Sequence, residues 1–291
     1  MRTILEIPII KTIVLRAIRG FAFFSGYHQR ISRLEANQKL LIDLIDVDKL
    51  VSIKKRIFSD LQVMSVVDKE LIRVGSKFDG GYVIVNNLDD IGVVISIGIG
   101  NNLDKEKYFL SKGLKVYAFD GTIGESVDLK DENFEFYPKN IGSKDDYWAL
   151  SFVFSKILNF NKISKKILLF IDTEGSEYDI LTNLGGSFLQ SVDQIVIEFH
   201  NLIGDSQKAQ AFSSIKSHLL KNFVVTHVHG NNYGSYLPFV GSEVIPDVVE
   251  VSFANRLFHT FESGLNVAPK NLDKPCNPLF PDLNFSWESS D

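Results

Sequence analysis

Hydrophobic residues follow two different periods along the chain, and the change between them near residue 66 divides it in two. Before that point the spacing is helical, with apolar residues at heptad-like intervals and charges between them: Leu34, Leu41, Leu44 and Val51. After it, short apolar runs alternate with helical patterns, which indicates parallel βαβ units in a doubly wound sheet. The pattern therefore predicts a helical N-terminal extension over residues 1–66 and an α/β domain over residues 67–291.

Seven apolar runs in the α/β domain have the length and composition of strands. The run VVISI is apolar throughout, as expected for a central parallel strand that is covered on both faces. Crossover helices are expected over 102–112, closed by Gly113, and over 206–221, opened by Asp205 or Ser206. We therefore expect a mostly parallel seven-stranded sheet with helices on both faces and strands near residues 92–97, 115–119, 134–138, 166–172, 193–199, 222–229 and 246–253.

Residues 7–24 have the pattern of a basic amphipathic helix, with apolar residues on one side and Lys11, Arg16 and Arg19 on the other. These charges leave no apolar run long enough to span a bilayer. No small-residue cleavage site follows, which argues against a secretory signal. We favour a helix packed on its own domain or on a dimer partner; the alternative is a helix that lies on an anionic membrane surface.

Composition narrows the function classes. The formal charge of -5 and the pI near 5.7 argue against a nucleic-acid partner, because binding to phosphates requires a positive surface. A single cysteine, Cys276, cannot form an intramolecular disulfide, which fits a reducing compartment and an inert thiol. We expect a cytoplasmic protein, with peripheral membrane contact through residues 7–24 as the alternative.

A glycine-rich turn follows the first strand of the predicted sheet, with Gly98 and Gly100 at its centre and Asn101 after them. Glycine allows a tight turn and lets backbone N–H groups approach a ligand. A complete dinucleotide fingerprint requires a third glycine at the position of Leu103. A nucleotide-type cofactor without a pyrophosphate therefore fits this turn best.

Three further segments bear on such a cofactor. Asp120 ends the second strand about 20 residues beyond the glycines, where an acid that binds ribose hydroxyls belongs. Gly142 lies after the third strand, where the chain passes the adenine ring, although the same sequence fits an ordinary turn. The motif KFDGGY, with Lys77 and Asp79, either closes over the carboxylate of the cofactor or forms a hairpin.

Acidic residues and histidines gather where later strands end. Ligands bind outside the carboxyl ends of strands in open parallel sheets, so these side chains should face one crevice: Asp172, Glu174, Glu198, His200, His227 and His229. Three uses compete for them. His200 or His229 would serve as a general base, Asp172, Glu198 and His200 would hold a divalent cation, or the group would only bind loops and helix termini. Glu177, one helical turn beyond Asp172, is expected to orient backbone or neighbours.

The loop HGNNYG presents amides and a phenol between glycines. Asn231, Asn232 and Tyr233 suit recognition of a hydroxyl-rich acceptor, and they are equally ordinary loop residues.

Taken together, the ordered motifs after about residue 68 resemble the FkbM-type family of S-adenosylmethionine-dependent methyltransferases. They are KFDGGY, ISIGIGNN, FIDTEGSEYDIL, VIEFHNL, HVHGNNY and IPDVVEVSF. The resemblance implies a Rossmann-like methyltransferase fold and, most often in the family, methyl transfer to an oxygen of a sugar or other secondary metabolite. In the usual strand order of that fold an antiparallel strand separates the HVHG and EFH strands, which places their ends roughly 10 Å apart, a long span for one ion.

The resemblance also assigns roles to individual residues. Gly98 and Gly100 would approach the methionine part of the cofactor, Asp120 would bind its ribose, and Asp172 would lie beside the methyl donor. The full set of expected cofactor contacts is Lys77, Gly98, Gly100, Asn101, Asp120, Gly142, Asp172 and Glu174. Acceptor contacts are expected at Glu198, Asn231, Asn232 and Tyr233, and the catalytic candidates are Asp172, His200 and His229.

Two other functions stay open from the sequence. One is a nicotinamide-dependent sugar oxidoreductase or epimerase, which Leu103 disfavours. The other is a non-catalytic cofactor-binding module.

Overall fold

The computed structural model describes residues 47–124, 127–161, 166–182, 188–239, 243–263 and 271–286. Most of the expected helical extension, including the amphipathic segment 7–24, lies outside these residues, so its structure and its membrane contact stay predictions. Among the helices in the described part of the chain, none is both long enough and apolar enough to cross a membrane. The chain divides into two compact units, Met1–Ile53 and Lys54–Asp291.

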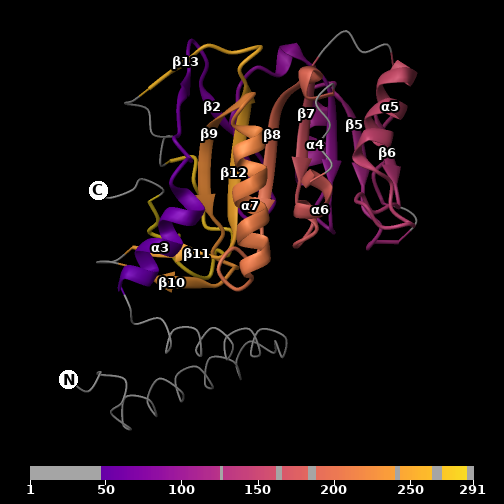
Figure 1. Ribbon diagram of the computed structural model, residues 1–291. Helices are drawn as coiled ribbons and strands as arrows, with labels where there is room; N and C mark the ends of the chain where they lie inside the picture. Colours follow the sequence, from indigo (N-terminus) through magenta and orange to yellow (C-terminus); the bar gives the residue numbers. More distant parts are fainter. Residues whose placement is uncertain are drawn as a thin grey trace, which may run out of the picture. The chain divides into compact units, whose positions relative to one another are not determined.

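The larger unit is built on a seven-stranded sheet with the order β6-β5-β4-β7-β8-β12-β9 (Figure 1). β4 pairs in parallel with β5 and β7, β5 with β6, and β7 with β8, whereas β12 is antiparallel to both β8 and β9. The expected mostly parallel sheet is therefore confirmed. Its strands are β4 (Ile91–Ile97), β5 (Lys115–Phe119), β6 (Phe134–Tyr137), β7 (Lys166–Ile171), β8 (Val192–Phe199), β9 (Phe223–Gly230) and β12 (Val249–Asn255).

The expected strand over 246–253 is wrong at its start. Residues Val244–Pro246 form a separate short strand, β11, which pairs with β10 (Tyr236–Pro238). Proline has no N–H to donate, so Pro246 cannot continue into β12, which needs hydrogen bonds on both sides. The chain therefore turns at Asp247 and Val248 before β12 begins.

Helices begin close to where the pattern placed them. Asp205 caps α7 (Ser206–Leu219) by accepting hydrogen bonds from the N–H groups of Gln207 and Lys208. α4 starts after Leu103, which makes no side-chain cap. The remaining elements are α3 (Val47–Phe58), α4 (Asp104–Ser111), α5 (Leu150–Asn161), α6 (Glu177–Thr182), η2 (Leu88–Asp90), η3 (Phe188–Ser191), the pair β1 (Ser65–Val66) and β13 (Phe261–Glu262), and the hairpin β2 (Leu71–Gly75) and β3 (Gly81–Val85).

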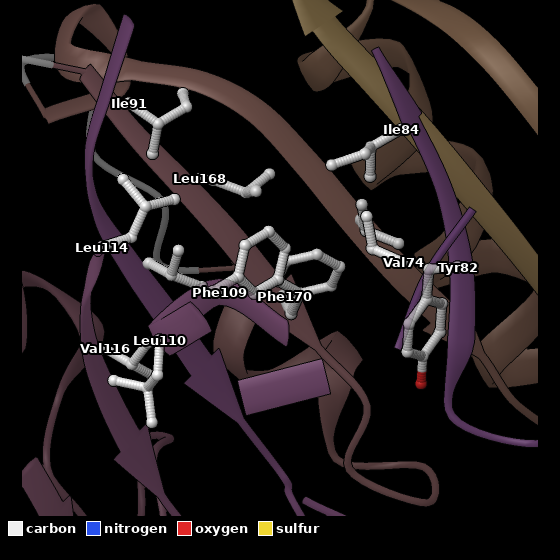
Figure 2. Packing of buried hydrophobic residues seen from close by; sticks show 12 residues of the cluster. Val74, Tyr82, Ile84, Ile91, Phe109, Leu110, Leu114, Val116, Leu168 and Phe170 are labelled. Atoms are coloured by element: carbon white, nitrogen blue, oxygen red, sulfur yellow. The ribbon is translucent and has the colours of Figure 1, made fainter. Parts of the chain in front are cut away.

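Two layers cover the sheet. On one face, α4 and the β2–β3 hairpin pack over a cluster in which Phe109 and Tyr82 each lie 5.6 Å from the ring of Phe170 (Figure 2). On the other face, Phe212 of α7 and Tyr178 of α6 pack on Phe199 of β8, at 4.7 and 6.0 Å. The motif KFDGGY forms the turn of the hairpin, one of the two structures expected for it.

Strand register fixes which polar residues share a face. Side chains alternate along a strand, so Asp172 follows Phe170, and Glu198 follows Val196, on the face that the hairpin covers. Glu250 of β12 lies directly between Glu198 and His229, because it pairs with both. A row of ionisable groups therefore crosses the sheet under the hairpin.

We expect Phe109→Ala to lower the free energy of unfolding by about 3–5 kcal/mol, because it removes a fully buried ring from the α4 cluster. Urea unfolding measures the change. Leu257→Ala, at a side chain that is 65% exposed, is the control and should stay within about 0.5 kcal/mol of the parent. A loss below about 1 kcal/mol for Phe109→Ala would show that α4 does not depend on this packing.

Candidate functional site

A cavity of about 310 Å³ opens at the carboxyl ends of β4, β5 and β7, within the usual size range of small-molecule sites. The hairpin turn, the glycine-rich turn after β4 and the segment after β7 form its walls. Lys77 and Gly142 do not line it. The expected cofactor residues that do line it are Gly98, Gly100, Asn101, Asp120, Asp172 and Glu174.

Gly98 lies where three strands come together. Its N–H donates to the carbonyl oxygen of Phe119, and the N–H of Asp172 donates to the carbonyl oxygen of Ile97. A Cβ on Gly98 would lie 1.6 Å from the carbonyl oxygen of Asp172, and the backbone has a left-handed φ of 78°. Only glycine fits this close approach.

Asp120 holds the glycine-rich turn from inside the cavity. Its Oδ2 accepts hydrogen bonds from the N–H groups of Ile99 and Gly100 at 3.1 and 2.9 Å, and its Oδ1 accepts two from Thr122. Burial raises the pKa of Asp120, but these hydrogen bonds outweigh burial and hold the pKa below its ordinary value. The side chain is therefore a carboxylate at neutral pH, and its contact with a ribose stays a prediction.

An aromatic group closes the cavity beside Asp120. Phe119 lines the cavity and stacks on Tyr137, with ring centres 5.0 Å apart and planes 9° apart. Trp148 packs on Tyr137 and holds Gly142, whose N–H donates to the Trp148 carbonyl oxygen. Gly142 itself does not line the cavity, but its chain neighbour Ile141 does.

Sequence reasoning missed Lys105, which is buried in the cavity wall. Its Nζ lies 5.1 Å from the ring centre of Tyr82 and 4.8 Å from that of Phe170. A lysine in the first turn of a helix is usually solvated, so only the packing of the hairpin on α4 reveals its position.

His227 and His229 do not join the expected crevice of acids and histidines, and the Nε2 of His227 lies 2.8 Å from Asp273 Oδ1 instead. The other four residues lie together at the ring of His200. Its Nε2 lies 3.4 Å from Glu198 Oε1, 3.6 Å from Glu174 Oε2 and 4.0 Å from Asp172 Oδ1. The other oxygen of Asp172, Oδ2, accepts a 2.7 Å hydrogen bond from the hydroxyl of Tyr82. The structure thus brings together Asp172 and Glu174 from the segment after β7 and Glu198 and His200 from the end of β8.

Burial and mutual charge set the protonation of this group. Burial raises the pKa of Asp172, and burial together with the Asp172 charge raises the pKa of Glu198 to about 8. Burial lowers the pKa of His200, but Glu177 and Glu198 outweigh it and raise the pKa to about 11. His200 therefore carries a proton at neutral pH and, in that state, cannot accept another from an acceptor hydroxyl.

Glu177 is fully buried behind His200. Its Oε1 accepts a hydrogen bond from the His200 N–H at 2.8 Å, and its Oε2 accepts one from the Gly175 N–H at 2.8 Å. The expected role of Glu177 in orienting backbone is confirmed. Glu174 and Asn201, in the two segments that Glu177 joins, have left-handed φ values of 53° and 60°, a type of backbone strain that clusters at functional sites.

His229 lies in a second group, beyond β12. Its Nδ1 is 3.0 Å from Glu250 Oε2 and its Nε2 is 3.1 Å from Asp282 Oδ1. The thiol of Cys276 is 3.5 Å from Glu250 Oε1. As expected, an antiparallel strand separates the strands of His229 and Glu198, and Glu250 on that strand, which sequence reasoning missed, connects the two groups.

The loop after β9 does not line the cavity. Asn231 donates a 2.7 Å hydrogen bond to Glu198 Oε1. Asn232 donates to the carbonyl oxygens of Asn277 and Pro281, and Tyr233 is 41% exposed. Contacts of these three residues with an acceptor stay predictions.

Comparison with known proteins matches this sequence to one protein family. The sequence model of the methyltransferase FkbM domain matches residues 85–233, which include the glycine-rich turn and the segment after β7. No curated protein matches the chain. Among solved structures, a putative hemolysin from Streptococcus thermophilus is similar at 13% identity and a TM-score of 0.34, over 66% of this chain and 76% of that one.

The close approach at Gly98 predicts a difference between two glycine substitutions. Gly98 and Gly100 both have left-handed backbones, but a Cβ on Gly100 meets nothing within 4 Å. Gly100→Ala should therefore cost only about 1–2 kcal/mol, and Gly98→Ala at least about 2 kcal/mol more. Urea unfolding of both variants measures the difference, and equal losses would refute the convergence of strands at Gly98.

His229 should make stability depend on pH. Burial lowers its pKa, but Asp282 and Glu250 outweigh burial and raise it from 6.5 to about 10. The stabilisation is then complete below about pH 6.5 and is lost as the pH rises through about 10. His229→Gln should cost several-fold more unfolding free energy at about pH 6 than at about pH 10 by urea unfolding. The same loss at both pH values would contradict the paired imidazolium.

Proposed function

The chain belongs to the FkbM family of methyltransferases, and from this premise we propose that it transfers a methyl group from S-adenosylmethionine to a hydroxyl oxygen of a carbohydrate or secondary metabolite. The observation that carries the proposal is the cavity where the Gly98 turn, Asp120 and Asp172 meet. The strand order, with one antiparallel strand next to the edge, supports a Rossmann-like methyltransferase fold.

The residues of the cavity fit the chemical groups of S-adenosylmethionine. The carboxylate of Asp120 suits two ribose hydroxyls, and the ring of Phe119 suits a flat base. Lys105 and Lys139 are cations in the same cavity that would bind the carboxylate of the methionine part. Asp172 and Glu174 would lie near the positive sulfonium and ammonium groups.

The Gly98 turn gives a further reason to prefer this cofactor over a dinucleotide. Asp120 already accepts the N–H groups of Ile99 and Gly100, two of the donors that would otherwise point at a phosphate. With these two N–H groups already bound, the turn has fewer donors left for a pyrophosphate. This adds to the argument from Leu103 against a nicotinamide-dependent oxidoreductase.

In the proposed reaction, Asp172 and the residues around it would remove the proton of the acceptor hydroxyl. When bound, S-adenosylmethionine would supply an electrophilic methyl group for transfer to the acceptor oxygen. Asp172 would take the hydroxyl proton, because burial raises its pKa and so makes its carboxylate a stronger base. The imidazolium of His200 and the hydroxyl of Tyr82 would hold Asp172 in place. His229, which does not line the cavity, would position Glu250.

The proposal predicts that Asp172→Asn lowers kcat by about 10²–10⁴-fold, because the acceptor loses its base. Release of S-adenosylhomocysteine is followed with a panel of hydroxylated sugars and polyols. Asp128→Asn, at an exposed carboxylate that does not line the cavity, is the matched control. Full activity of Asp172→Asn on an acceptor that the parent methylates would remove Asp172 from the mechanism.

Asp120→Asn should weaken binding of S-adenosylmethionine by roughly 10- to 100-fold, because a charged hydrogen-bond partner of the ribose is lost. Isothermal titration measures the affinity, and the melting temperature shows whether the glycine-rich turn is intact. If Asp120→Asn binds the cofactor as tightly as Asp128→Asn does, Asp120 serves only the turn.

A further inference from the structure

His200 has carboxylate oxygens on one side of its ring at distances that do not suit hydrogen bonds. Its Nε2 lies 3.4 Å from Glu198, 3.6 Å from Glu174 and 4.0 Å from Asp172. N–H···O hydrogen bonds usually span about 2.7–3.2 Å. Three acceptors thus surround one nitrogen, and all of them lie too far away for a hydrogen bond of ordinary length.

The other nitrogen of His200 strengthens this observation. The side chain is only 8% exposed, and Nδ1 is buried with no hydrogen-bond partner among the described residues. It faces Glu177 Oε1 at 3.4 Å. A carboxylate behind one nitrogen of an imidazole, with oxygen ligands in front of the other, is the arrangement found around metal-binding histidines.

The spacing of the donors suits an ion. Ligands that each lie about 2.1 Å from a metal are separated from one another by about 3.0–3.4 Å. One donor atom each from Asp172, Glu198 and His200 lie within 4.8 Å of one another. A modest inward movement of the carboxylates would therefore complete a coordination shell.

Charge favours a cation as well. Burial, together with the charges of Asp172, Glu250 and Glu174, raises the pKa of Asp79 to about 6. Glu198 pairs with Glu250 across the sheet and adds a further carboxylate.

We propose that Asp172, which lines the cavity, and Glu198 and His200 behind it bind one divalent cation of the Mn²⁺ class. Binding would displace the proton that His200 holds in the absence of the ion. Two carboxylates and one imidazole form a mixed oxygen and nitrogen set, which suits Mn²⁺ better than Mg²⁺, a cation that prefers oxygen ligands alone. Tyr82 occupies only Oδ2 of Asp172, so Oδ1 faces the site.

The role of the cation rests on the proposed function, whereas its binding does not. Three protein ligands leave about half of an octahedral shell free for other ligands, and of the three only Asp172 lines the cavity. A cation there would hold two neighbouring oxygens of an acceptor and lower the pKa of the hydroxyl to be methylated. The acceptor class is then a compound with adjacent hydroxyls, such as a sugar with a vicinal diol.

The described residues hold a second group of metal-type donors, His229, Glu250 and Cys276. Its hydrogen bonds can be compared with those of the Asp172 group. Both nitrogens of His229 already have carboxylate partners at 3.0 and 3.1 Å, and the thiol of Cys276 has Glu250. This group is complete without an ion, so the cation belongs to the Asp172 group.

Electron paramagnetic resonance of Mn²⁺ titrated into the full chain, without S-adenosylmethionine, tests the site. We expect one bound Mn²⁺ per chain, with spin-echo modulation from an imidazole nitrogen. His200→Gln should lose the modulation and weaken binding at least tenfold, and Glu198→Gln, as a second ligand variant, should also weaken it. Cys276→Ser should bind as the parent does, and melting temperatures confirm that each variant is folded.

Three results would overturn the proposal: no binding of Mn²⁺, Mg²⁺ or Zn²⁺ at millimolar concentration, full binding by both ligand variants, or loss of binding in Cys276→Ser. Failure of the proposed function is separate, because it would show as absent cofactor binding while Mn²⁺ still binds. With an active chain, Mn²⁺ should raise turnover of a vicinal diol and leave turnover of an isolated hydroxyl unchanged.

Discussion

The meeting of three strand ends at Gly98 is the constraint on which the site depends. Hydrogen bonds from Gly98 to Phe119 and from Asp172 to Ile97, at 2.8 and 2.9 Å, tie β4 to the ends of β5 and β7. The backbones lie so close that a Cβ at position 98 would overlap the Asp172 carbonyl. Asp120 and Asp172 are thereby held on rigid backbone at opposite sides of one cavity, as cofactor and acceptor groups require for a transfer reaction.

Burial of several acids on one face follows from the hairpin that covers the sheet there. Unpaired carboxylates are costly in a protein interior, and this chain offsets the cost in two different ways. His229 is paired closely with Glu250 and Asp282, which completes that group and joins the C-terminal segment to the sheet. His200 faces its acids at longer distances, which leaves its group open to a ligand.

Much of this architecture was predictable from the sequence, because periodicity and strand ends are local properties. VVISI, KVYAF and LLFI are strands as expected, and the rule that ligands bind at strand ends brought Asp172, Glu198 and His200 together. Glu250 was missed although an antiparallel strand was expected between β8 and β9, because the register that sets Glu250 opposite Glu198 and His229 depends on pairing between distant segments. The positions of Lys105 and Cys276 were missed for a similar reason: each depends on packing between segments far apart in the sequence.

Isothermal titration of the full chain with S-adenosylmethionine, and separately with NADH, distinguishes the proposed cofactor from a dinucleotide. We expect one binding site for S-adenosylmethionine and no measurable heat from NADH, because the Gly98 turn and Asp120 suit a ribose without a pyrophosphate. Binding of NADH together with no binding of S-adenosylmethionine would contradict the proposed cofactor.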